Sequence, residues 1–396
     1  MLRKSLILRL FDAFSIQRWN DKIRPVELTE MDKNAHKMVI AFCLAKYEED
    51  SGTMVNWTNI IKGGIFELLR RVVLSDIKSP VYRSIKVKRK EVFLELNKWV
   101  FSQLEPCIDN TSIKKEFQAY LKEEEVIDPL SSRILAAAHI YASYWEFQII
   151  KQISPDGYQM KEIDKLMLND IEEHLDLIGM RKIITKQKIL NFIELVGQLR
   201  FQIRWSHTPR IPSTSVLGHS MMVASLSYLL STELCCCDER LKNNFFGGLF
   251  HDLPESVTRD IISPVKGAVP ELSEVIGQIE KEMAETEIYP LIEASWKEEF
   301  TYFTENEFES KIIENGEIKI LSTEEITQKY NENKYKPIDG QITKIADHLA
   351  AFVEAYKANE TGIHTPQMEE GRHNLLAQYR GQTIGGLNIG NIYADF

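Results

Sequence analysis

The stretch GGLFHDLPESVTRDIISPVK, residues 247–266, is the most informative part of this chain. It carries an apolar run that ends on an adjacent pair, His251 and Asp252. A second histidine, His219, lies upstream in GHSMMVASLSYLL, and a second acid, Asp347, lies downstream in KIADHLAAFVEA. Two imidazoles and two carboxylates on separate helical segments can converge on one divalent cation. This mixture of nitrogen and oxygen donors favours Mn²⁺, Fe²⁺, Co²⁺, Ni²⁺ or Zn²⁺ over Ca²⁺ and Mg²⁺.

The segments around two of these residues have helical periodicity. Apolar residues in 217–230 and in 341–356 recur at intervals of three and four, which predicts an amphipathic helix in each. His219 falls in the first turn of one and Asp347 beside the apolar stripe of the other. Both are also compatible with ordinary residues at the edge of a core. A buried carboxylate without a partner is costly, however, and a metal ion would supply that partner.

These residues in their helical context resemble the HD-domain superfamily of metal-dependent phosphohydrolases, and most of all the bacterial HD-domain 5′-deoxynucleotidases. That family has an Arg-Trp pair ahead of the first histidine, as Arg204 and Trp205 are here. It also has Glu, Thr and Asp, and then Pro-Val-Lys, after the His-Asp pair. The corresponding residues in this chain are Glu255, Thr258, Asp260 and Lys266. The resemblance covers about residues 195–360.

The resemblance implies a role for each of these residues. The metal ligands, for one divalent transition metal (Mn, Co, Fe, Ni or Zn), would be His219, His251, Asp252 and Asp347. Glu255 would be the catalytic acid or base that handles the attacking water beside Asp252. The substrate-binding residues would be Arg204 as a phosphate clamp, Trp205 as a wall for sugar or base, Asp260 at the deoxyribose, Thr258 and Lys266. A guanidinium suits the clamp because it donates to two phosphate oxygens at once. Gly218 precedes His219 where the family has Glu, so the sugar and base preference stays open.

The chain also contains an internal repeat. The stretch GGIFELLRRVVLSDIKSPV, residues 63–81, aligns without a gap with residues 247–265. In order along the chain, Arg18-Trp19 matches Arg204-Trp205, His36 matches His219, and Ala138-His139 matches Asp347-His348. Such self-similarity indicates a duplicated unit. Glu67-Leu68 replaces the His-Asp pair and Arg71 replaces Glu255, so the first copy is interpreted as a degenerate domain that holds no metal.

The sequence therefore predicts an all-α protein of two tandem HD-like domains, a degenerate one at 1–180 and a catalytic one at 181–396. An insert at about 267–340 contains an Asn-Gly between alternating residues, which predicts a small hairpin. The Gly-rich C-terminal tail, 381–396, is expected to be extended. Helices are predicted over 91–105, 112–126, 133–152, 162–178 and 184–204, and the basic run 82–90 as a loop or strand edge. The two domains are expected to pack as a pseudo-dimer, and a higher oligomer stays open.

Composition narrows the class of protein. Hydrophobic residues make up 44% and charged residues 27% of the 396 residues, which is typical of a soluble globular protein. The net charge of −10 argues against an extended nucleic-acid-binding face. The five cysteines form no C-x-x-C pair, which favours a reducing cytoplasm over a zinc-finger site or a disulfide framework. No run reaches the length of a membrane span, so no membrane contact is expected.

The predicted activity is release of phosphate from nucleoside 5′-monophosphates, especially the deoxy forms, with a small nucleotide as partner. Two alternatives remain. One is an HD phosphohydrolase that acts on nucleoside triphosphates, cyclic dinucleotides or alarmones. The other is a nucleotide sensor without catalytic activity.

Overall fold

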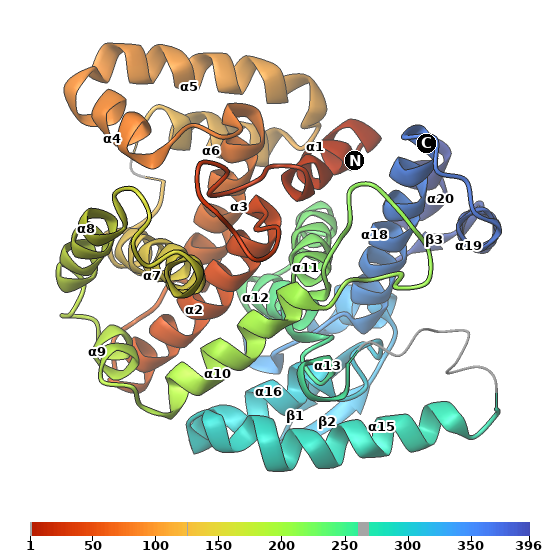
Figure 1. Cartoon of the computed structure of the whole chain (residues 1–396). Helices are drawn as coiled ribbons and strands as arrows, with labels where there is room; N and C mark the ends of the chain where they lie inside the picture. The colour runs from red at the N-terminus through yellow and green to blue at the C-terminus, as the bar shows by residue number, and fades with distance from the viewer. Residues whose placement is uncertain (1, 125, 260–268) are drawn as a thin grey trace.

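The structure, a computed structural model, describes residues 2–124, 126–259 and 269–396, and these are mainly helical (Figure 1). The helices of the first half are α1 (Lys4–Phe11), α2 (Glu30–Asp50), α3 (Trp57–Leu74), α4 (Ser79–Lys88), α5 (Lys90–Leu104), α6 (Thr111–Leu121), α7 (Pro129–Ile153), α8 (Met160–Glu172) and α9 (Ile178–Ile184). Those of the second half are α10 (Lys188–Gly197), α11 (Val216–Glu233), α12 (Asp238–Phe250), α13 (Glu255–Thr258), α15 (Leu272–Met283), α16 (Lys297–Thr304), α17 (Thr323–Glu325), α18 (Gly340–Glu360), α19 (Pro366–Tyr379) and α20 (Ile389–Ala394). The strands are β1 (Lys311–Glu314), β2 (Glu317–Ile320), β3 (Thr383–Ile384) and β4 (Leu387–Asn388), which form two small antiparallel hairpins. The all-α prediction is confirmed.

Helices α2 and α11 form the centre of the molecule and pack against each other. Every residue from Glu30 to Glu48 in α2 and from Val216 to Ser231 in α11 is buried. A helix that is buried on all sides needs no polar face, which is why α11 is not the amphipathic helix that the spacing of its apolar residues predicts. Around this pair, α3 and α7 pack on α2, while α12 and α18 pack on α11 (Figure 1).

Both central helices begin in the same way. The Thr29 side chain accepts a hydrogen bond from the backbone N–H of Asp32, and the Ser215 side chain accepts one from the N–H of Gly218. Such N-caps satisfy amide groups that have no partner within the helix. Because the cap fixes where each helix starts, it also fixes which face each residue of the first turn presents.

The core is continuous between the halves of the chain. The Phe42 ring of α2 lies 4.8 Å from the Phe246 ring and 5.2 Å from the Phe250 ring, both of α12. Polar contacts also join the two halves of the chain. Asp32 accepts a hydrogen bond from Ser215, and Arg200 forms an ion pair with Glu146 at 3.0 Å. The halves are therefore not two independent bodies on a tether. The predicted pseudo-two-fold relation between them stays a prediction.

The two ends of the chain meet. The backbone N–H of Lys4 donates to the Asp395 carboxylate at 2.8 Å, and the Lys4 ammonium donates to the Phe396 carbonyl at 3.3 Å. Figure 1 shows α1 and α20 on the same side of the molecule. The first helix of the chain thus also stabilises the last.

The hairpin predicted in the insert is present as β1 and β2. Its turn is Asn315-Gly316, and both residues have positive φ (55° and 84°), the conformation for which Asn-Gly is preferred in tight hairpin turns. The extended tail is wrong, since residues 383–394 form the hairpin β3–β4 and then α20, which buries Ile392 and Tyr393. The basic run 82–90 is also not a strand edge; it continues the exposed helix α4 into the start of α5.

The predicted boundary at residue 180 falls inside α9, and the breaks between helices on either side of it are at 173–177, after α8, and at 185–187, before α10. The predicted helix 184–204 is correspondingly shorter, because the chain leaves the helix after Phe201.

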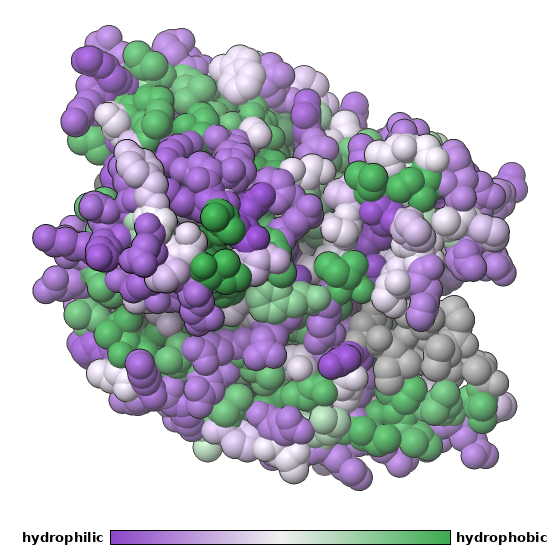
Figure 2. Space-filling view, in the orientation of Figure 1, coloured by the Kyte–Doolittle hydropathy of each residue, from purple (hydrophilic) through white to green (hydrophobic). Residues whose placement is uncertain are grey.

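In the space-filling view polar and apolar side chains are mixed, and apolar ones gather along α15, where Val275 and Ile279 are each 46% exposed (Figure 2). Among the described residues no helix has the combination of length and apolarity needed to cross a bilayer.

Candidate metal centre and phosphate site

Three helical segments of the second half bring His219, His251 and Asp347 together. His219 lies in the first turn of α11, His251 directly follows α12, and Asp347 lies in α18. One potential ligand atom from each lies within 4.8 Å of the others. Both imidazoles are buried, and the Asp347 carboxylate is 21% exposed. Within the described parts of the chain this is the one group of three or more such side chains with this spacing.

The imidazoles are oriented so that both Nε2 atoms face carboxylates. His219 Nε2 lies 2.9 Å from Asp347 Oδ1, and His251 Nε2 lies 3.2 Å from Asp252 Oδ2. Each Nδ1 faces another group: in His251 it lies 2.8 Å from the Gly248 carbonyl, and in His219 it lies 3.6 Å from Glu354 Oε1. Metal-binding histidines usually have one nitrogen on the metal and the other on a carbonyl or carboxylate. The donors of His219, His251 and Asp347 thus fit a divalent transition metal. Asp252, the fourth predicted ligand, contacts His251 but is not part of this group, so its role as a ligand stays a prediction.

The electrostatics of the cluster show how its charges are balanced. Burial disfavours the charged form of His251, but Asp252 and Asp347 outweigh it and raise the pKa of His251 to about 9. Burial also opposes the charge of Asp347, yet its hydrogen bond to His219 lowers the pKa of that carboxyl. The carboxylates therefore stay ionised and require positive charge in a buried place, which a protonated imidazole or a cation provides.

Arg204 and Trp205 lie next to this cluster on the loop between Phe201 and α11. Arg204 Nη1 lies 4.0 Å from Asp252 Oδ2, and Arg204 Nε lies 3.4 Å from Glu354 Oε1. The Trp205 indole donates to Glu354 Oε2 at 2.7 Å. Glu354 is 2% exposed and also accepts a hydrogen bond from Thr214 at 2.7 Å. This one carboxylate therefore fixes the orientation of the Arg-Trp pair.

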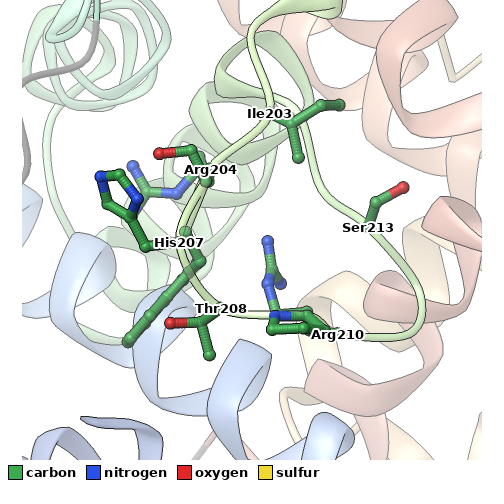
Figure 3. Close-up of a pocket in the computed structure, with 9 residues that line it drawn as sticks. Ile203, Arg204, His207, Thr208, Arg210 and Ser213 are labelled. Atoms are coloured by element: carbon green, nitrogen blue, oxygen red, sulfur yellow. The ribbon is translucent and has the colours of Figure 1, made fainter.

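The same loop surrounds a cavity of about 390 Å³, bounded by residues 203–210 and 213. Figure 3 shows Arg204 and His207 on one side of the loop, whereas the Arg210 guanidinium points into its interior. Trp205 borders the cavity as well. A hollow of this size beside the predicted phosphate clamp has room for part of a small ligand.

The remaining predicted site residues have different outcomes. Glu255 begins α13 and is buried, and its backbone carbonyl accepts a hydrogen bond from Gln202 at 3.0 Å. The Thr258 hydroxyl donates to the Pro254 carbonyl at 3.3 Å. Asp260 and Lys266 lie outside the described residues, so their predicted roles stay predictions.

Sequence analysis missed several residues of this region. Glu354 and Arg210 are buried around the Arg-Trp pair. Burial raises the pKa of Glu307, from the segment before β1, and the charges of His251 and Asp252 also act on it. One signal in the sequence was available for Glu354. The segment around Ala138-His139 was aligned with Asp347-His348. If that alignment is shifted by one residue, Glu146 aligns with Glu354.

The first-half residues that were matched to ligands, His36 and Glu67, contact different neighbours. The His36 imidazole is fully buried, with Nε2 3.0 Å from the Ile193 carbonyl and its ring against Trp145. Glu67 instead contacts Lys37 and His139. His36 therefore has surroundings unlike those of His219, because it lies on the face of α2 that packs against α10.

Comparisons with known proteins cover the part of the chain that contains this cluster. The family model of the HD domain matches residues 196–376. A 5′-deoxynucleotidase of Vibrio vulnificus (strain YJ016) is 23% identical over 185 residues, which are 44% of this chain and 77% of that protein. A 5′-deoxynucleotidase of Vibrio parahaemolyticus serotype O3:K6 (strain RIMD 2210633) is 23% identical over 201 residues, 48% of this chain and 86% of that protein. No solved structure matches the chain significantly. Residues 196–376, which contain the His-His-Asp cluster, therefore belong to the HD domain family.

Proposed function

We propose that the second half of the chain is a metal-dependent phosphomonoesterase that acts on nucleoside 5′-monophosphates, preferably the deoxy forms. The observation that carries the proposal is the buried group of His219, His251 and Asp347, with Arg204 beside it. Two imidazoles, carboxylates and an adjacent guanidinium are the components that metal-assisted phosphate hydrolysis requires. The two curated relatives are named 5′-deoxynucleotidases, which supports the substrate class.

Each residue has one role in the proposed mechanism. His219, His251, Asp252 and Asp347 would hold a divalent ion, which supplies an activated water and polarises a phosphoryl oxygen when bound. Glu255 would orient the attacking water and accept its proton. Arg204 donates hydrogen bonds to phosphoryl oxygens and balances the charge that grows on them in the transition state.

Other residues position these groups. Glu354 holds Arg204 at its Nε atom, so that the opposite end of the guanidinium faces the cluster. Trp205, fixed by the same carboxylate, forms a wall of the cavity for the sugar or base. Asp260 and Lys266 would contact the deoxyribose and the phosphate. The catalytic domain is proposed to extend from about residue 181 to 396.

A phosphate-release screen with Mn²⁺ or Co²⁺ tests this proposal. The substrates are ribo- and deoxynucleoside mono-, di- and triphosphates, cyclic dinucleotides and alarmones, and the highest kcat/KM is expected for deoxynucleoside 5′-monophosphates. Turnover of triphosphates or cyclic dinucleotides alone would show a different HD phosphohydrolase. Nucleotide binding without turnover of any substrate would show a sensor.

The ligand set is tested separately with Asp252→Ala, which should lose both bound metal and activity. Asp156→Ala, at an exposed position in the first half, is the control and should change neither. An Asp252→Ala protein that keeps one metal per chain by mass spectrometry would remove Asp252 from the ligand set.

A further inference from the structure

We propose that the first half of the chain contains a metal-free counterpart of the metal centre, in which the side chain of Lys33 takes the place of the metal ion. The inference rests on the proposed function only in that the second half binds the metal. It concerns Lys33, Glu67 and His139, whose side chains come from α2, α3 and α7.

The first correspondence is at the start of the central helices. An isolated backbone bridge joins Gln17 to Thr29 in the first half and Ile203 to Ser215 in the second. In each case the second residue of the bridge is the N-cap of the central helix. Counted from these caps, the residue of α2 that corresponds to His219 is Lys33, not His36.

Helix packing gives the same correspondence independently. A Cβ atom on Gly64 of α3 would overlap the end of the Met38 side chain of α2, and a Cβ atom on Gly248 of α12 would lie 3.0 Å from the Ala224 Cα of α11. Gly64 and Gly248 belong to the gapless repeat. Met38 follows Lys33 by the same number of residues as Ala224 follows His219. The close helix crossing therefore also pairs Lys33 with His219, and the repeat pairs Glu67 with His251.

The third correspondence links α7 with α18. Arg18 Nε and the Trp19 indole both lie 2.9 Å from Glu146, just as Arg204 and Trp205 contact Glu354. Trp19 and Trp205 even share an unusual positive φ, 54° and 57°. Glu146 follows His139 by the same interval as Glu354 follows Asp347. The counterpart of Asp347 is thus His139, rather than Ala138 as the sequence alignment predicts.

The corresponding side chains form a closed cluster around the Lys33 amino group. Lys33 Nζ lies 2.5 Å from His139 Nδ1 and 3.9 Å from Glu67 Oε1, and His139 Nδ1 lies 2.8 Å from the same Glu67 oxygen. The other Glu67 oxygen accepts a hydrogen bond from Lys37 at 2.5 Å. Both lysine side chains are fully buried. The Asp252 position is Leu68, which offers no ligand atom.

A lysine can replace a metal ion in this place for simple reasons. An amino group can bond to several acceptors, and in its charged form it supplies the positive charge that a buried carboxylate requires. Burial lowers the pKa of Lys33 to about 7, whereas Glu67 and Glu30 counteract this. In either protonation state Nζ fills the space between Glu67 and His139. The result is a cross-link between α2, α3 and α7 that needs no metal.

The proposal is tested by exchanging the lysine for a ligand. Lys33→His places an imidazole at the first-half position that corresponds to His219. There it lies beside Glu67 and His139 and so creates a set of two nitrogen ligands and one oxygen ligand. Lys37→Val removes the competing ammonium, and the corresponding residue in the second half is Val223. Both changes are made in full-length His251→Ala, which under the proposed function no longer holds its own metal. Co²⁺ content and the visible Co²⁺ spectrum are measured at pH 7.5.

We expect the Lys33→His/Lys37→Val chain to bind about one Co²⁺, and the control Lys33→Met/Lys37→Val, also in His251→Ala, to bind none. A folded His variant that binds no more Co²⁺ than the control would overturn the proposal. If these variants do not fold, the metal content of the single variant His251→Ala, whose first half is unaltered, provides the test. One bound metal in that chain would also overturn the proposal, whereas complete loss of bound metal supports it. Because phosphate release is not a readout, failure of the phosphatase assay is a separate result.

Discussion

Arg204 lies between the proposed metal centre and the loop of residues 203–213 that surrounds the cavity. It lies 4.0 Å from Asp252 on one side and contacts Glu354 on the other. Arg204→Ala should lower kcat/KM for a nucleoside monophosphate by roughly 10²-fold, because a charge-assisted contact in the transition state is lost. Metal content should stay at the wild-type value.

The control for this prediction is Arg9→Ala, which removes an exposed arginine of α1 that pairs with Asp12 only at 3.6 Å. It should leave kcat/KM unchanged. Wild-type turnover in Arg204→Ala would exclude Arg204 from the phosphate site, and loss of metal would show that it acts on the cluster instead.

At the scale of single elements, the close crossing of α11 and α12 positions His219 relative to His251. Gly248 makes this possible, since a Cβ atom there would lie 3.0 Å from Ala224 Cα and 3.1 Å from its nitrogen. Gly248→Ala should therefore push the helices apart, lower the unfolding free energy by about 1–3 kcal/mol and weaken metal binding. Chemical denaturation and a metal titration measure both effects.

Gly277→Ala in α15 is the matched control with the opposite expected sign. Nothing lies within 4 Å of the added Cβ atom, and the position is inside a helix. Removing the conformational freedom of this glycine should stabilise the protein by about 0.5–1 kcal/mol. If both alanine variants had the same effect, the explanation through helix contact would fail.

Whole-molecule stability depends on buried charges that join the halves. Glu146 is fully buried and forms ion pairs with Arg18 of its own half and with Arg200 of the second half. Burial opposes the charge of Glu146, but the two arginines outweigh it and lower its pKa. Glu146→Gln leaves these arginines without their counter-charge, and should reduce the unfolding free energy at pH 7 by about 3 kcal/mol.

The pH dependence of this loss has a defined sign. A carboxyl whose pKa is lower in the folded than in the unfolded protein stabilises the fold above its ordinary value of 4.5, and this stabilisation is lost as pH falls below it. The difference between wild type and Glu146→Gln should therefore be constant from pH 7 to 5 and narrow below 4.5. The exposed pair Glu95–Lys98 is the control, and Glu95→Gln should cost at most about 1 kcal/mol. A difference that grows on acidification would contradict the assignment.

The continuous core also predicts how the second half behaves by itself. In a fragment of residues 185–396, the surface of α12 around Phe246 and Phe250 would lose the contact with Phe42. We expect such a fragment to be insoluble or to self-associate, since an apolar surface of this kind is exposed to water. Light scattering after size-exclusion chromatography measures this, and a monomeric, fully active fragment would show that the first half is dispensable to the fold.

The helical class, the hairpin at Asn315-Gly316 and the three residues that come together at the cluster could be predicted from the sequence. These follow from local signals, because turn chemistry, helical spacing and the types of ligand are visible in a single stretch of chain. The His-Asp pair at 251–252 and the Arg-Trp pair at 204–205 are the clearest examples.

The surroundings of Lys33, of His36 and of the Arg-Trp pair could be seen only in the folded chain. In the sequence His36 aligns with His219 because both are histidines in a similar context, whereas the N-caps and the glycine contacts support our proposal that Lys33 is the counterpart. Likewise, Glu354 is distant along the chain from Arg204 and Trp205, and only the packing of α18 on α11 brings it to them. The physical reason is that a residue's partners depend on the helix face it occupies and on the helix packed against that face, and neither can be read from a local pattern.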